Sequence, residues 1–96
     1  MKDYGLAKIE FNISLEELIR NIKRLRNWNS GQREIRLEEA DSKIPEKVSE
    51  AKNLVSRLCY NGQFCKNAGI DYDNIQTEDS RLIKAAIADY LLDQES

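Results

Sequence analysis

The first part of the chain alternates polar and apolar side chains with a period of two. The alternation covers residues 8–13, where Ile9, Phe11 and Ile13 are the apolar positions. A period of two is typical of a strand that buries one face and exposes the other. The pattern therefore predicts an N-terminal strand whose three apolar side chains point toward a core.

A second, shorter candidate strand lies within residues 32–41. Ile35 and Leu37 share the period of two, but no third apolar residue supports it. The two glutamates and the alanine at 38–40 favour a helix in the same segment. The choice between strand and helix therefore stays open here, with a short strand beside the first one preferred.

Three longer segments carry apolar side chains every three or four residues, which indicates amphipathic helices. The first covers about residues 14–28 and opens on Ser14, the N-cap of a capping box. The second begins at Pro45, because proline suits the first turn of a helix, and closes at Asn61-Gly62. The third begins at Thr77, which is a favourable N-cap residue.

The last of these helices is apolar over much of its circumference rather than along one stripe. Such a helix is buried on more than one side. In so short a chain it either forms the centre of the fold or packs against a second copy. The segment before it, residues 63–77, is mostly polar and predicts a loop with one helical turn.

Together these elements predict one domain over residues 1–96. Its expected class is α+β and mostly helical, with an N-terminal strand, three main helices and an optional second short strand. The alternative is an all-α bundle with an extended N-terminal arm. We find no internal repeat and no low-complexity segment that would divide the chain.

Composition excludes several classes of protein. The chain has no histidine, which excludes histidine-based catalytic triads and histidine metal sites. Its two cysteines are too few for a disulfide framework and suit the reducing cytoplasm. The apolar runs are too short for a membrane span, and no apolar segment typical of a signal peptide follows Met1. We therefore expect a cytoplasmic protein with no membrane partner.

No motif in the sequence predicts catalysis or cofactor binding. Asp71 and Asp73 begin like a calcium-binding loop, but the later ligand positions are not filled. Cys59 and Cys65 lack the further cysteine or histidine that a zinc site needs. No glycine-rich loop has the spacing that cradles phosphates. We therefore expect no enzyme, no catalytic residue, no metal and no cofactor.

The small net charge of −2 conceals a separation of charge along the chain. Residues 20–36 carry a net charge of +5, whereas residues 71–96 carry a net charge of −5. Such asymmetry indicates association with a charged partner. Two other interpretations stay open: the basic side chains pair along their own solvated helix, or they lie against the acidic C-terminal part of the same chain.

These patterns predict a small non-catalytic binding protein, a regulator or inhibitor that contacts a protein with an acidic surface. Arginine makes forked contacts to carboxylates, and exposed aromatic side chains often anchor interfaces. The last helix is the expected surface for homo-oligomer contacts. The candidate partner-binding residues are Arg20, Arg24, Trp28, Arg33, Arg36, Tyr60 and Phe64.

Two alternative functions use many of the same residues. In the first, arginines and an aromatic ring at an oligomer interface sequester a small anionic ligand such as a nucleotide. In the second, the chain binds nucleic acid, because the strand–helix order of the first forty or so residues resembles ribbon-helix-helix repressors. That resemblance implies that Lys8, Glu10 and Asn12 face the bases and that Arg33 and Arg36 contact phosphates. The pI of about 5.2 argues against a nucleic-acid partner.

Overall fold

The computed structural model describes residues 13–95, and that part of the chain is 84% helical and contains no strand. The fold is therefore all-helical, and the prediction of an α+β class was wrong. The predicted N-terminal strand, including Ile9 and Phe11, lies outside the described residues, except that Ile13 is fully buried. The elements are α2 (Leu15–Arg26), α3 (Ser30–Lys43), α4 (Pro45–Cys59), α5 (Gly62–Ala68), the 3₁₀ turn η1 (Tyr72–Asn74) and α6 (Thr77–Glu95).

The candidate strand within residues 32–41 is part of helix α3. Asn29 starts this helix, because its side chain accepts a hydrogen bond from the Gln32 N–H at 2.8 Å while the Gln32 side chain accepts one from the Asn29 N–H at 3.3 Å. Leu37 is buried but Ile35 is 65% exposed, so the two side chains do not share a face. Two apolar residues two positions apart were too little to establish a strand.

The segment predicted as a loop contains helix α5. The Asn61 side chain accepts a hydrogen bond from the Phe64 N–H at 3.0 Å, so Asn61 begins a new helix instead of only closing α4. Gly69 ends α5 in the left-handed conformation, with φ of 76°, and the Ile70 N–H donates to the Cys65 carbonyl at 2.8 Å. The short helix and η1 thus form the turn between α4 and α6.

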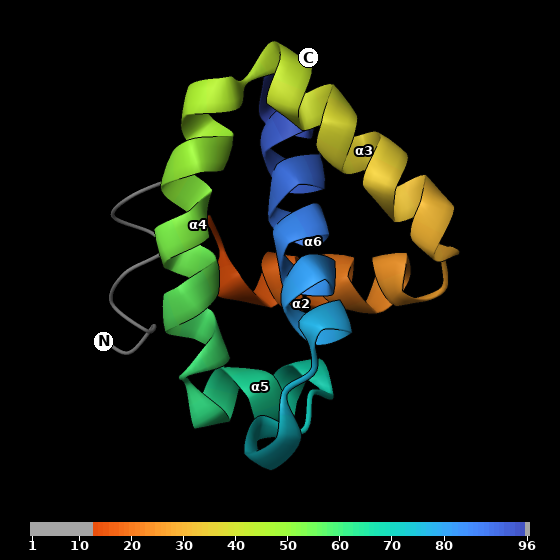
Figure 1. Cartoon of the computed structure of the whole chain (residues 1–96). Coiled ribbons are helices and arrows are strands. Elements are labelled where there is room, and N and C mark those ends of the chain that lie inside the picture. Colours follow the sequence, from red (N-terminus) through yellow and green to blue (C-terminus); the bar gives the residue numbers. More distant parts are fainter. Residues whose placement is uncertain (1–12, 96) are drawn as a thin grey trace.

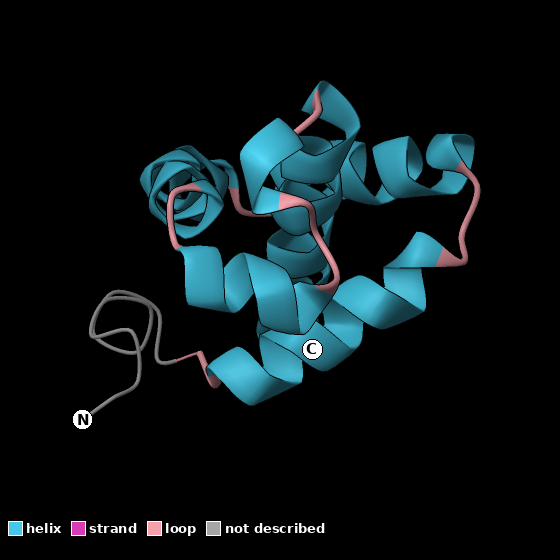
Figure 2. Cartoon of the chain, turned by 90° about the horizontal axis from the view of Figure 1, so that it is seen from below, coloured by secondary structure: helices cyan, strands magenta, loops and turns pink. Residues whose placement is uncertain are grey.

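Helix α6 is the central element of the fold. In Figure 1 it runs between α4 and α3 with α2 crossing behind it, and it contacts all three of these helices. Figure 2 shows the same packing from below, with helices on several sides of the core. The apolar side chains around α6 are therefore buried within one chain, and a second copy is not needed to cover them. Its buried residues are Leu82, Ile83, Ala85, Ala86, Ile87, Ala88, Asp89, Leu91 and Leu92.

In the part of the chain that the structure describes, no helix has the length and apolar character needed to cross a membrane.

Candidate functional site

A buried carboxylate joins α2, α3 and α6. Asp89 of α6 is only 3% exposed, and it accepts hydrogen bonds from Arg36 Nε at 2.6 Å and Asn21 Nδ2 at 3.1 Å. Arg24 of α2 forms a short ion pair with the same carboxylate. A buried carboxylate needs such partners, because burying an unpaired charge is costly. Asp89 and its three partners therefore form a structural clamp between the helices.

Arg36 is also paired with two further carboxylates, Glu39 at 2.9 Å and Asp93 at 3.2 Å. Burial lowers the pKa of Arg36, but the hydrogen bonds and charges of Asp89 and Glu39 outweigh this and leave the pKa raised. Hydrogen bonds from Arg36 and Lys43 hold the pKa of Glu39 below its ordinary value. The positive charge of Arg36 is thus neutralised within its own chain.

Arg33 closes the end of a helix rather than facing outward. Its Nη1 donates to the carbonyl of Leu25 in the last turn of α2, at 3.0 Å, and to that of Trp28 just beyond the helix, at 2.6 Å. Carbonyls at a helix C-terminus lack partners inside the helix, and a cation satisfies them well. Glu78 of α6 lies 3.9 Å from the same guanidinium. Arg33 therefore stabilises the fold, and only 17% of its side chain is exposed to a binding partner.

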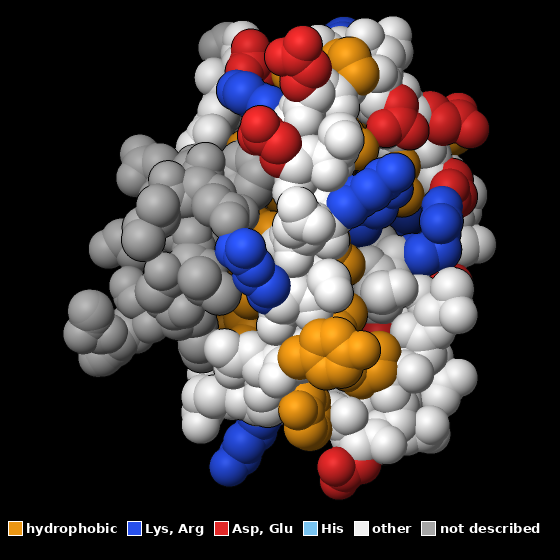
Figure 3. Space-filling model, turned by 60° about the vertical axis from the view of Figure 1, so that its left-hand side comes forward, with side chains coloured by type: hydrophobic (Ala, Val, Ile, Leu, Met, Phe, Trp, Pro, Cys, Tyr) orange, Lys and Arg blue, Asp and Glu red, His pale blue; other side chains and the backbone are white. Residues whose placement is uncertain are grey.

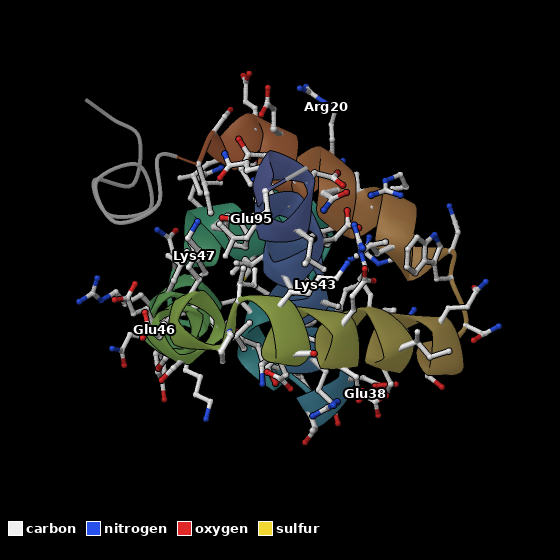
Figure 4. The ribbon with its side chains drawn as sticks, turned by 90° about the horizontal axis from the view of Figure 1, so that it is seen from above. Arg20, Glu38, Lys43, Glu46, Lys47 and Glu95 are labelled. Carbon is white, nitrogen blue, oxygen red and sulfur yellow. The ribbon has the colours of Figure 1, made fainter. Side chains whose placement is uncertain are left out.

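Arg20 and Lys23 are the exposed cations of this surface. Both lie on the outer face of α2, and neither has an ion pair or a hydrogen bond to another described residue. Figure 4 shows Arg20 pointing away from the body of the fold. Lys23 was not among the predicted partner-binding residues. Of the four predicted arginines, Arg20 alone has no hydrogen bond or ion pair with a residue in the range 13–95.

Trp28 and Arg24 form a compact pair beside these cations. The Arg24 guanidinium lies 5.5 Å from the centre of the Trp28 ring, in cation–π geometry. The Arg24 side chain is 51% exposed even though one nitrogen is held by Asp89. Ile35 of α3 lies close by, because it lines a surface hollow together with Trp28 and Arg24. We call Arg20, Lys23, Arg24, Trp28 and Ile35 the α2–α3 face.

Two shallow hollows flank Arg24. One has a volume of about 590 Å³ and includes Arg20, Lys23 and Tyr90 in its lining. The other has a volume of about 460 Å³ and contains Trp28 and Ile35. The α2–α3 face therefore offers both apolar area and recesses that side chains of another molecule can enter.

The two aromatic residues predicted near residue 60 have different environments. Tyr60 is 78% exposed, at the end of α4. Phe64 is fully buried in the core, so the prediction that it is an exposed contact residue was wrong. The reason is local: α5 turns Phe64 inward beneath the end of α4, a helix that the sequence pattern did not reveal. Tyr60 and Phe64 therefore belong to different parts of the molecule.

The thiols offer little nucleophilic chemistry. Cys59 and Cys65 are both free, and burial, aided by nearby negative charge, raises the pKa of each thiol. The Cys65 thiol donates to the Leu58 carbonyl at 3.5 Å. Within residues 13–95, no group of three cysteines or acids lies close enough to hold a metal ion.

No family model matches the chain, and neither the curated proteins nor the solved structures include one that is significantly similar to it.

Proposed function

We propose that this chain is a small non-catalytic binding protein that regulates or inhibits another protein by covering part of its surface. The observation that supports this most directly is the α2–α3 face, where Arg24 lies over Trp28 beside the exposed Ile35. Arginine and tryptophan are the residue types that most often contribute large binding energies at protein interfaces. Its two free thiols suit the cytoplasm as the compartment in which it acts.

The charge of this face favours an acidic partner. Arg20 and Lys23 have no acidic partner among the described residues, whereas Arg36 is occupied by Asp89, Glu39 and Asp93. Free cations at the rim of an interface steer an acidic protein into contact and repel a basic one. The proposed occupant is therefore a protein surface with carboxylates around an apolar centre.

The surroundings of Trp28 argue against a small anionic ligand. The hollow of about 460 Å³ is large enough for one, since such pockets measure roughly 300–1,000 Å³. However, the two cations in its lining, Arg24 and Arg36, are already paired with Asp89, Glu39 and Asp93, so the hollow offers no unpaired cation to a small anion. For nucleic acid, Arg36, which was expected to contact phosphates, is already held by carboxylates. A protein partner is thus better supported than either alternative.

The proposal can be tested with two matched charge reversals. Arg20→Glu changes an exposed cation on the α2–α3 face, and Lys66→Glu changes an exposed cation on α5. Arg24 is avoided because it also holds Asp89. A partner first captured by the full-length chain from its native host is identified and purified. Its affinity for each variant is then measured by calorimetry at physiological salt.

We expect Arg20→Glu to weaken binding roughly tenfold and to reduce the salt dependence of association, while Lys66→Glu leaves both unchanged. Ile35→Asp, which places a carboxylate at the apolar centre of the face, should weaken binding further. A partner that binds wild type, Arg20→Glu and Ile35→Asp equally well would contradict the proposal. So would a partner whose contact surface is basic.

A further inference from the structure

A third hollow lies on a different part of the molecule, between α4, η1 and the start of α6. Its volume is about 750 Å³. Val55, Cys59 and Ile75 contribute its apolar lining, and the exposed Tyr60 and Tyr72 also line it. Figure 3 shows hydrophobic side chains gathered on this side of the molecule, toward the end where α4 meets α5. None of its lining residues belongs to the α2–α3 face.

The two tyrosines are held in place but remain open to solvent. The Tyr72 hydroxyl donates to the Tyr60 carbonyl at 3.2 Å, which ties η1 to the end of α4. Even so, Tyr60 is 78% and Tyr72 is 46% exposed. A tyrosine buries roughly 150–250 Å² when it is covered, so this pair offers much apolar area at little cost in flexibility. Exposed aromatic side chains beside an apolar hollow indicate an interaction surface.

Charges of opposite sign lie at the two ends of this hollow. Lys52 lies on α4 eight residues before Tyr60, which is about 12 Å along the helix. Asp73 follows Tyr72 in η1, and the Tyr72 hydroxyl donates to the Tyr60 carbonyl, which places Asp73 toward the Tyr60 end of the hollow. Both side chains are exposed, and neither forms an ion pair with another residue in the described range. The hollow is thus basic at one end, apolar in the middle and acidic at the other end.

A surface with this arrangement is complementary to itself. In a two-fold dimer each copy presents the same patch, rotated so that its two ends exchange places. The basic end of one copy then meets the acidic end of the other, and the apolar middle parts cover each other. A hollow suited to a basic or an acidic peptide would carry one sign of charge along its length, which this one does not.

We propose that the α4–η1 surface is a homodimer interface. Two copies pack α4 against α4 in antiparallel directions, so that Lys52 of each copy pairs with Asp73 of the partner subunit. Tyr60 and Tyr72, at the acidic end of each copy, cover the apolar lining near the basic end of the opposite hollow. The sequence led us to expect oligomer contacts through the last helix, but α6 is covered by its own chain, and the exposed apolar area lies here instead.

The test measures the mass of the full chain in solution by sedimentation equilibrium. Protein concentrations run from about 5 to 300 µM, because an interface of modest size assembles in this range. Lys52→Asp and Asp73→Lys each bring like charges together at both contacts of the dimer. We expect the dissociation constant of the dimer to be at least tenfold higher for each variant alone than for wild type. Tyr60→Ser should have a similar effect, because it removes an aromatic ring from each side.

Mixing the two charge variants gives the decisive measurement. A heterodimer of Lys52→Asp with Asp73→Lys restores opposite charges at both contacts, so the mixture should regain the dimer mass that neither variant reaches alone. Lys66→Asp, on α5 and outside the hollow, should dimerise like wild type, and far-UV circular dichroism confirms that every variant is folded. A chain that stays monomeric at about 300 µM would overturn the proposal. Single variants that dimerise normally, or a mixture that stays monomeric, would also overturn it.

Discussion

At the scale of single residues, Asp89 does the most to define how the helices meet. It is an acid in a helix whose neighbouring positions are almost all apolar, and it receives hydrogen bonds from α2 and from α3. The sequence contained a signal for this. A carboxylate among the buried positions of a helix requires cations nearby, and residues 20–36 supply them. The pairing itself could not be predicted, because it depends on how α2 and α3 cross α6.

The first prediction concerns this carboxylate. Asp89→Asn keeps the shape of the side chain but removes the charge that Arg24 and Arg36 share. Breaking a buried ion pair typically costs about 3–5 kcal/mol, and because Arg24 is half-exposed we expect the lower end of that range, roughly 3 kcal/mol. Urea unfolding followed by circular dichroism at 222 nm measures the change in the free energy of unfolding.

Asp93→Asn is the matched control. Asp93 also pairs with Arg36, but its side chain is 69% exposed, and exposed pairs contribute no more than about 1 kcal/mol. We expect its free energy of unfolding to stay within about 0.5 kcal/mol of wild type. Equal losses of unfolding free energy in Asp89→Asn and Asp93→Asn would contradict the conclusion that burial makes the Asp89 carboxylate important for stability.

At the scale of elements, local signals predicted the bounds of α2 and α4 to within a few residues, but they missed the two helices that begin at asparagine caps, α3 and α5. Ser14 and Pro45 stand where α2 and α4 begin, as their capping and backbone preferences predict. Asn61 was ambiguous, because asparagine both follows one helix and caps the next. The α5 helix spans only seven residues, so it shows too few turns for a periodic pattern to be recognised in the sequence.

The second prediction concerns the end of α5. Gly69 has φ of 76°, and a Cβ atom added there would lie 3.2 Å from Nη1 of Arg26, which donates through Nη2 to the Ala68 carbonyl. Gly69→Ala should therefore destabilise the protein by about 1–2 kcal/mol. Gly62→Ala is the control, because its added Cβ would make only ordinary contact with Tyr72, at 3.8 Å.

Alanine also restricts the unfolded chain, so Gly62→Ala should be neutral or stabilising by up to about 1 kcal/mol. Both variants are compared with wild type by thermal and urea unfolding at a protein concentration where they are monomeric. A Gly69→Ala protein that is as stable as Gly62→Ala would contradict the role of the left-handed conformation at this turn.

At the scale of the whole molecule, much of the charge separation seen in the sequence is resolved inside the fold. Arg24 and Arg36 meet Asp89 of the acidic C-terminal segment, and Arg81 of that segment pairs with Glu34 at 2.7 Å. The interpretation in which basic and acidic parts of one chain lie together is confirmed for these residues. Charge counts along a sequence cannot distinguish this outcome from a surface for a partner, because both need the same residues.

The last prediction follows from the single core around α6. Because α6 contacts α2, α3 and α4, these helices should unfold together in one two-state transition. Trp28 is the only tryptophan, and its fluorescence reports on the junction of α2 and α3, whereas circular dichroism reports on all helices. The midpoints of the two urea unfolding curves should coincide.

Phe64→Leu, at the far end of the core in α5, should lower the stability by up to about 1.5 kcal/mol and move both curves by the same amount. If Phe64→Leu shifts the dichroism curve and leaves the fluorescence curve in place, α5 unfolds independently and the chain does not have one cooperative core.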